Sequence, residues 1–260
     1  MTEEHQALRH DFLPEALGPL LKEQGFGGSV AVQGREAVTE TEWLLLLADE
    51  YSFIQAVVGW VDLCASDVER DLDRFAAHPR FKGARMFIHD KSDEDFAARP
   101  EFRRGVTLLG TYGLTYDLLL KPPHLDSATR LVDSMPNQKF VVDHSAKPEI
   151  RLGRFAAWRA GITEIAKRPN VYCKVSGLVT EADWENWRPS DIFPYLDVVA
   201  EAFGSERLMI GSDWPVCLCA GCYPDAISVV RDWSNRLSTS EQAEIFGLTC
   251  ARFYGIDTST

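Results

Sequence analysis

The chain has 260 residues, of which 45% are hydrophobic and 25% are charged, a composition typical of a globular protein with a large core. Its formal net charge of −12 argues against nucleic acid and against an anionic membrane surface as partners. The polar, acidic start and the shortness of every apolar run predict a soluble, cytoplasmic protein. The acidic total does not exclude a small-molecule substrate, even an anionic one, because a few local Arg or Lys residues could hold it.

Strand-like apolar runs alternate with amphipathic helical patterns along the chain. A helical pattern over 14–24 comes first, and strands are then predicted at 28–33, 54–63, 83–88, 114–120, 139–144, 171–176 and 208–213. Helices are predicted at 41–50, 67–77, 127–135, 155–167, 192–203, 224–237 and 240–254. The last of them should have Ser240 as its N-cap and Gly255 beyond its end. This alternation predicts a parallel sheet.

The length and the β-α alternation favour an α/β fold of the (β/α)8 TIM-type barrel class, with residues 1–260 as a single domain. Such a barrel has eight strands, whereas only seven are visible here and a helical pattern precedes the first. We therefore expect the first strand to be missing. The gap would leave two exposed strand edges, and such edges are commonly covered or paired, so a homodimer is one expectation. An open doubly wound sheet is the alternative, but no glycine-rich phosphate loop follows a strand.

Two predicted strands end in titratable side chains. One delivers Asp213 and is stopped by Pro215, and another ends in His144. The carboxyl ends of parallel strands are where α/β folds bind ligands and carry out chemistry. An ordinary aspartate is a weak base at neutral pH, so Asp213 would need a nearby cation or a buried setting to act as one. An aspartate that caps a turn and a histidine satisfied in the core are the alternative interpretations.

Other charged residues lie within or beside these strands. Arg85 and Lys174 fall inside predicted strands, where a charge is costly unless it is paired. They form either an internal salt bridge, with Asp117 or Asp62, or a cradle for a carboxylate or lactone oxygen. Asp143 directly precedes the strand-end histidine and should therefore point to the opposite face of the strand.

Two tryptophans lie at or just past strand ends. Trp60 and Trp214 each offer an indole face against which a sugar ring packs well. Filling of the core is the alternative role for both. They are therefore candidate walls of a substrate pocket.

Six motifs occur along the chain in an order and spacing that characterise one family. They are Arg9-His-Asp-Phe-Leu-Pro14, Val57-Val-Gly-Trp60-Val-Asp62, Lys82-Gly83-Ala-Arg85, Asp143-His144, Cys173-Lys174-Val-Ser176-Gly177-Leu and Gly211-Ser-Asp213-Trp214-Pro215. With them the chain resembles the amidohydrolase-related family of metal-dependent TIM-barrel hydrolases, in particular its L-fuconolactonase-like branch of sugar lactonases.

The resemblance implies hydrolysis of a cyclic ester, in this branch a sugar lactone. Asp213 would take a proton from water and His144 would stabilise the oxyanion. The substrate-binding residues would be Arg85, Lys174, Trp60 and Trp214. A decarboxylase or an amide hydrolase on the same barrel remains an alternative, because a fold does not fix its chemistry.

The family opens with a first strand that ends in His-x-His, two metal ligands, and this sequence contains no such element. His144 and Asp213 are then the candidate ligands of one divalent metal, zinc or manganese. We expect this metal to be bound weakly. A catalytically impaired binding protein that lacks the metal histidines is therefore a further alternative.

Overall fold

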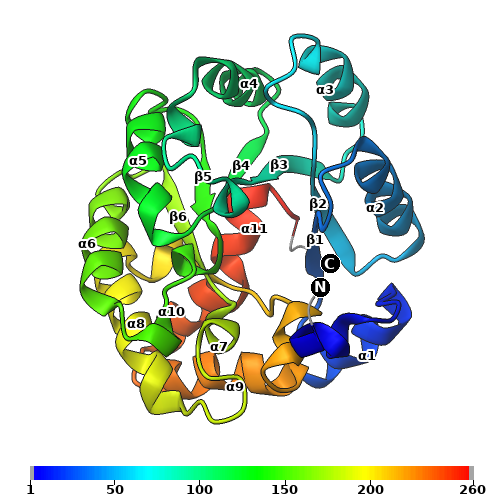
Figure 1. Ribbon diagram of the computed structural model, residues 1–260. Coiled ribbons are helices and arrows are strands. Elements are labelled where there is room, and N and C mark those ends of the chain that lie inside the picture. Colours follow the sequence, from blue (N-terminus) through cyan, green and yellow to red (C-terminus); the bar gives the residue numbers. More distant parts are fainter. Residues whose placement is uncertain (1–2, 258–260) are drawn as a thin grey trace.

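The computed structural model describes residues 3–257, in which seven parallel strands form one curled sheet (Figure 1). The strands lie side by side in chain order: β1 (Ser29–Val32), β2 (Ile54–Gly59), β3 (Phe81–Phe87), β4 (Thr115–Leu119), β5 (Phe140–Val142), β6 (Val171–Val175) and β7 (Leu208–Ile210). All seven predicted strands are present. Most end earlier than predicted, because the last residues of the apolar runs form the turns that follow.

Helices alternate with these strands, and α2 to α6 and α8 cover the convex outer face of the sheet (Figure 1). No helix within residues 3–257 is long and apolar enough to cross a membrane. The helices are α1 (Pro14–Glu23), α2 (Val38–Glu50), α3 (Val68–Ala76), α4 (Pro100–Thr111), α5 (Leu125–Asp133), α6 (Phe155–Ala166), α7 (Leu178–Glu181), α8 (Pro189–Phe203), α9 (Tyr223–Ser234), α10 (Thr239–Ala243) and α11 (Thr249–Tyr254).

Helix α4 has no counterpart among the predicted ranges. Gly105 stands in its middle, and glycine weakens a helix because its backbone loses more freedom on folding. The structure explains this glycine, since a Cβ at position 105 would lie 2.1 Å from the backbone oxygen of Leu63. The close packing of α4 against the backbone of Leu63 therefore requires glycine at position 105, although glycine weakens the helical pattern in the sequence.

The predicted helix over 240–254 is divided into three parts. Ser238, rather than Ser240, caps α10, and its Oγ accepts a hydrogen bond from the backbone N–H of Glu241. A π-helical turn at Glu244–Leu248 then separates α10 from α11. Helix α11 ends as predicted at Gly255, which has a left-handed backbone with φ of 64°.

Helix α11 lies inside the curve of the sheet instead of on its outer face (Figure 1). The hydroxyl of Tyr254 donates a hydrogen bond to Asp117 Oδ2 on β4 at 2.8 Å. Phe253 and Tyr254 pack against inward-facing residues of β2, β5 and β7, namely Ala56, Val58, Val141 and Met209. Within the described sheet, β1 and β7 each pair on one side only, as expected of a barrel-type sheet with seven strands.

Candidate active site

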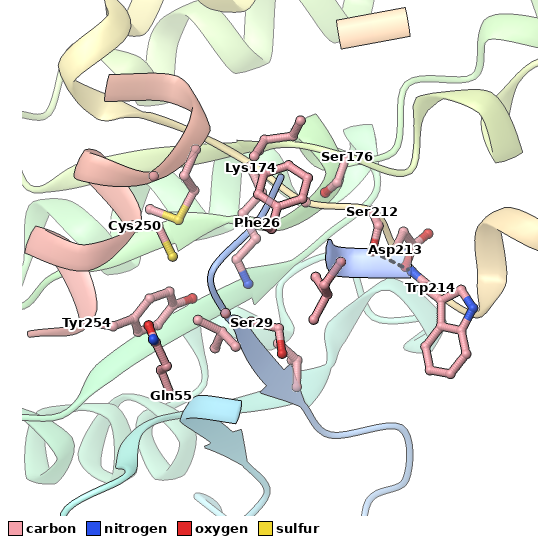
Figure 2. A pocket seen from close by; sticks show the side chains of 18 of the residues that line it. Phe26, Ser29, Gln55, Lys174, Ser176, Ser212, Asp213, Trp214, Cys250 and Tyr254 are labelled. Atoms are coloured by element: carbon pink, nitrogen blue, oxygen red, sulfur yellow. Dashed lines mark hydrogen bonds between the residues drawn. The ribbon is translucent and has the colours of Figure 1, made fainter. Parts of the chain in front are cut away.

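A cavity of about 840 Å³ lies along the open side of the sheet, between β1 and β7, and reaches residues at the carboxyl ends of β5, β6 and β7. Ser176, Ser212 and Asp213 stand toward one end of the view in Figure 2, whereas Gln55 and Tyr254 stand toward the other. Polar side chains therefore lie at both ends of the cavity.

The cavity brings together the two strand-end residues singled out in the sequence. His144 Nε2 lies 3.4 Å from Asp213 Oδ1. Both side chains are largely buried, with 11% and 13% of their surface exposed, and both residues line the cavity. Asp213 has a left-handed backbone with φ of 55°, a conformation that non-glycine residues adopt at some cost. The turn after β7 therefore holds this carboxylate in a fixed position.

Ser176 supplies the second contact of the imidazole. Its Oγ lies 2.8 Å from His144 Nδ1. Burial lowers the pKa of His144, and the carboxylates of Asp213 and Asp143 offset this only in part. A neutral imidazole beside a carboxylate carries its proton on the nitrogen that faces the carboxylate, because the carboxylate can only accept. We infer that Nε2–H faces Asp213 and that the Ser176 hydroxyl donates to Nδ1.

An unusual turn positions His144 after β5. Four successive residues, His144, Ser145, Ala146 and Lys147, have left-handed backbones with φ between 48° and 59°. Each such residue is strained, so the surroundings must hold the turn. The indole N–H of Trp158 on α6 donates to the backbone oxygen of Ser145 at 2.7 Å, and both residues are fully buried.

The expectation that Asp143 points away from the site is wrong. Strand β5 ends at Val142, so the alternation of side chains along a strand does not reach residue 143. The Asp143 carboxylate is fully buried and accepts a hydrogen bond from Arg85 Nη1 at 2.7 Å. Its other oxygen lies 2.7 Å from Lys174 Nζ. Asp143 therefore holds both cations of the cavity wall.

The internal salt bridge predicted for the strand cations is present. Lys174 Nζ lies 2.5 Å from Asp117 Oδ2. Burial raises the pKa of Asp117 to about 6 despite this nearby cation. Arg85 pairs with Asp143, as described above. Asp62, the other predicted partner, instead accepts a hydrogen bond from the backbone N–H of Cys64. Both cations nevertheless line the cavity, so an ion pair and a place in the pocket wall are not exclusive.

The two candidate tryptophans have different positions. Trp214 lines the cavity, and its ring meets Phe12 edge-on at a centroid distance of 5.3 Å. Trp60 is not among the lining residues, which corrects the expectation that it forms a pocket wall. Its backbone N–H donates to Thr41 Oγ1 at 2.7 Å, and its side chain packs against the hydrophobic core. The turn after β2 thus directs this ring into the core.

Sequence reasoning gave no role to two residues that the structure brings to the site. Ser176 stands two positions after Lys174, and this period of two is the signal that would have placed both on the inward face. Tyr254 carried no such signal, because the last helix of a barrel is expected outside the sheet. The hydrogen bond from Tyr254 to Asp117 therefore had to be seen in three dimensions.

The side chains at this site do not fit a protein-held catalytic metal. Among residues 3–257, no group of three or more His, Cys, Asp and Glu side chains is arranged to hold an ion. His144 and Asp213 supply two ligands, whereas catalytic zinc sites take three from the protein.

Comparisons with known proteins point to one family. The amidohydrolase family profile matches residues 1–256. The L-fucono-1,5-lactonase of Burkholderia multivorans is 40% identical over 262 residues, which covers 96% of this chain and 88% of that protein. The L-fucono-1,5-lactonase of Burkholderia ambifaria is 36% identical over 258 residues, with the same coverage.

A solved structure extends the likeness to three dimensions. It is the crystal structure of an amidohydrolase from Burkholderia multivorans with bound zinc. It superposes with a TM-score of 0.94 and is 39% identical in sequence, over 98% of this chain and 93% of that one. The barrel-type fold predicted from the sequence agrees with this likeness.

Proposed function

The chain belongs to the amidohydrolase family, and from this premise we propose that it is a hydrolase that opens a sugar lactone. The observation that carries the proposal is the pair of His144 and Asp213, which face one another at 3.4 Å in a cavity large enough for a sugar ring. Two lactonases that match 96% of the chain support the substrate class.

Asp213 is the general base of the proposed reaction. Its carboxylate lines the cavity and faces His144, so a water molecule beside it would meet a lactone held in the same space. Asp213 takes a proton from this water while the water oxygen attacks the lactone carbonyl carbon. The left-handed turn that follows β7 keeps the carboxylate aimed into the cavity.

His144 stabilises the negative charge that develops on the carbonyl oxygen. Its Nε2–H faces the ionised carboxylate of Asp213, and this donor becomes free for the carbonyl oxygen once Asp213 has taken the proton of the attacking water. Ser176 keeps the imidazole in this tautomer through the contact at Nδ1. Collapse of the tetrahedral intermediate breaks the ring C–O bond. Asp213 then returns its proton to the leaving alkoxide, which gives the open hydroxy acid.

Trp214, Arg85 and Lys174 line the same cavity and form the proposed binding surface for the sugar ring. The indole of Trp214 offers an apolar face for the C–H side of the ring. His144 and Asp213 alone are fewer protein ligands than a catalytic zinc takes, so the reaction is written with the side chains of this chain.

A lactone panel tests this function. The purified chain would be incubated with 1,4- and 1,5-aldonolactones while acid release is followed with a pH indicator, with and without added zinc or manganese. We expect saturable hydrolysis above the spontaneous rate. The Asp213→Asn variant supplies the matched blank. A panel in which no lactone is hydrolysed faster than in this blank would contradict the proposal.

A further inference from the structure

Two cations stand in the wall of the cavity, and each is already held by a buried carboxylate. Arg85 donates from Nη1 to Asp143 Oδ2 at 2.7 Å and from Nη2 to the backbone oxygen of Gln33. Lys174 Nζ lies 2.5 Å from Asp117 Oδ2 and 2.7 Å from Asp143 Oδ1. Two positive charges in the wall are thus matched by two negative charges behind it.

These charges persist at neutral pH. Each oxygen of the buried Asp143 carboxylate faces one cation, Oδ2 the guanidinium of Arg85 and Oδ1 the ammonium of Lys174, both at 2.7 Å. Burial alone would lower the pKa of Lys174, and the carboxylates of Asp117 and Asp143 raise it above its ordinary value. Burial raises the pKa of Asp117 to about 6, so this group is ionised above that pH. The four-residue cluster is therefore electrically neutral at pH 7.5.

The rest of the cavity supplies no cation to replace them. Its other carboxylates are those of Asp213 and Asp257, and the His144 imidazole already faces Asp213, with 3.4 Å between Nε2 and Oδ1. Among the lining residues, all of which the structure describes, Arg85 and Lys174 are the only lysine or arginine side chains. A substrate carboxylate would have to displace a buried carboxylate from one of them or remain unpaired beside Asp213, and both are costly.

Uncharged polar side chains complete the surface. They offer donors and acceptors that suit the hydroxyl groups of a sugar ring. These residues are Ser29, Gln33, Gln55, Ser176 and Ser212.

We propose that Asp117 and Asp143 are specificity-determining residues that restrict the substrate to uncharged polyhydroxy lactones, because they neutralise the two cations that would otherwise bind a substrate carboxylate. The inference rests on the lactone hydrolase function proposed above. Neither aspartate touches the substrate. Each acts through the cation that it holds, and lactones of aldaric acids, which carry a second carboxylate, are excluded.

A matched pair of lactones tests the inference in the wild-type protein. D-galactono-1,4-lactone and D-galactaro-1,4-lactone share their ring and differ at C6, which is a hydroxymethyl group in the first and a carboxylate in the second. At pH 7.5 we expect kcat/KM to favour the uncharged lactone by about 100-fold or more, the range in which a site rejects a group that it cannot pair.

Two variants locate the cause of this preference. Asp143→Asn leaves Arg85 without a carboxylate partner, and Asp117→Asn leaves Lys174 and Arg85 to share Asp143, so each variant gives the cluster one unmatched positive charge that can bind the substrate carboxylate. We expect each variant to narrow the kcat/KM ratio between the uncharged and the carboxylated lactone by about tenfold or more, because the substrate carboxylate gains one charge-assisted contact. The change should come mainly from a lower KM for the carboxylated lactone. The ratio cancels any general loss of catalysis. Asp62→Asn is the matched control, because Asp62 caps a turn outside the cavity, and its ratio should equal that of the wild type.

The outcomes separate the inference from the function on which it rests. Hydrolysis of neither lactone, nor of any other aldonolactone, overturns the proposed function. Hydrolysis of both lactones at similar kcat/KM leaves the function standing and overturns the inference. An unchanged ratio in variants that circular dichroism shows to be folded also overturns it. If a variant does not fold, the wild-type protein decides the question by two measurements. One is its kcat/KM ratio for the two lactones, and the other is competitive inhibition. The inhibition constant of the dianion galactarate should be at least tenfold higher than that of uncharged galactitol.

Discussion

His144 Nε2 lies 3.4 Å from Asp213 Oδ1, although the strands that precede these residues, β5 and β7, are separated by β6. The contact exists because both turns depart from ordinary strand geometry. Each residue has a left-handed backbone just past its strand, with φ of 50° at His144 and 55° at Asp213. The two side chains therefore meet over the end of β6, where Ser176 contacts the same imidazole.

Asp213→Asn should reduce lactone turnover by about two to four orders of magnitude, because the amide cannot accept the proton of the attacking water. Asparagine tolerates the left-handed backbone, so the fold should be retained. Turnover and circular dichroism measured together would check both points. Asp126→Asn, at an exposed carboxylate on α5, should leave turnover unchanged. Near-normal turnover in the Asp213 variant would remove this residue from the mechanism.

Ser176→Ala should lower kcat about tenfold and change KM little, because it removes the hydrogen bond at Nδ1 that, together with Asp213 at Nε2, fixes the tautomer of His144. Steady-state kinetics would separate the two parameters. Ser228→Ala is a suitable control, since that hydroxyl bonds only to the backbone oxygen of Asp225 on the surface of α9. A kcat equal to that of the wild type would show that Ser176 does not position the imidazole.

Tyr254→Phe should destabilise the protein by about 1–3 kcal/mol, because it removes one of the two donors to the buried carboxylate of Asp117 and leaves Lys174 as the other. Tyr112→Phe provides a close comparison. Its hydroxyl also donates to a carboxylate, that of Asp73, but on the surface, so the loss there should stay within about 0.5 kcal/mol. Urea unfolding of the three proteins would measure both differences. Equal losses in the two variants would contradict the structural role of the α11 contact.

His89 should make stability depend on pH. Burial lowers the pKa of His89 to about 4, from an ordinary value of 6.5. Between these values the unfolded chain binds a proton that the folded protein does not, so stability is lost as pH falls from about 6.5 to about 4. The loss should reach at most about 2 kcal/mol, since the ring is partly exposed to solvent.

His89→Gln provides the measurement for this dependence. Its unfolding free energy should change less than that of the wild type between pH 7 and pH 4.5, when both are followed by urea titration. Parallel pH profiles for the two proteins would rule out His89 as the source.

Zinc should bind weakly, because the described residues bring only His144 and Asp213 within reach of one ion. After dialysis against EDTA we expect well under one zinc ion per chain, with an unchanged melting temperature and unchanged turnover. Elemental analysis and thermal unfolding before and after dialysis would check this. One zinc retained per chain, together with lost turnover on its removal, would show that other residues complete the site.

The strands could be predicted because parallel strands buried on both faces leave continuous apolar runs in the sequence. The same logic placed His144 and Asp213 at one edge of the sheet. It failed for Asp143, because β5 ends at Val142 and the two-residue alternation of the strand ends with it. It failed for Trp60 for a related reason, since the direction of a side chain past a strand end depends on the turn.

Two other features were beyond sequence analysis because they depend on packing between distant segments. Gly105 argues against a helix locally, and only the approach of α4 to the backbone of Leu63 explains it. The inward position of α11 follows from the space beside β7, which no periodicity in residues 249–254 reveals. The sequence analysis named Asp117, which pairs with Lys174, as a salt-bridge partner. It did not name Asp143, which pairs with Arg85.

The inward position of α11 also sets the order in which the molecule can be completed during synthesis. Tyr254 stands 137 positions after Asp117, yet the two side chains share a hydrogen bond in the interior. A ribosome that has made every strand has not yet released the residues that fill the concave side of the sheet. The nascent chain therefore holds an unfinished, water-accessible interior until α11 leaves the exit tunnel. Chaperones and proteases meet it in that state, and a ribosome stalled before α11 presents them with charged residues meant to be buried.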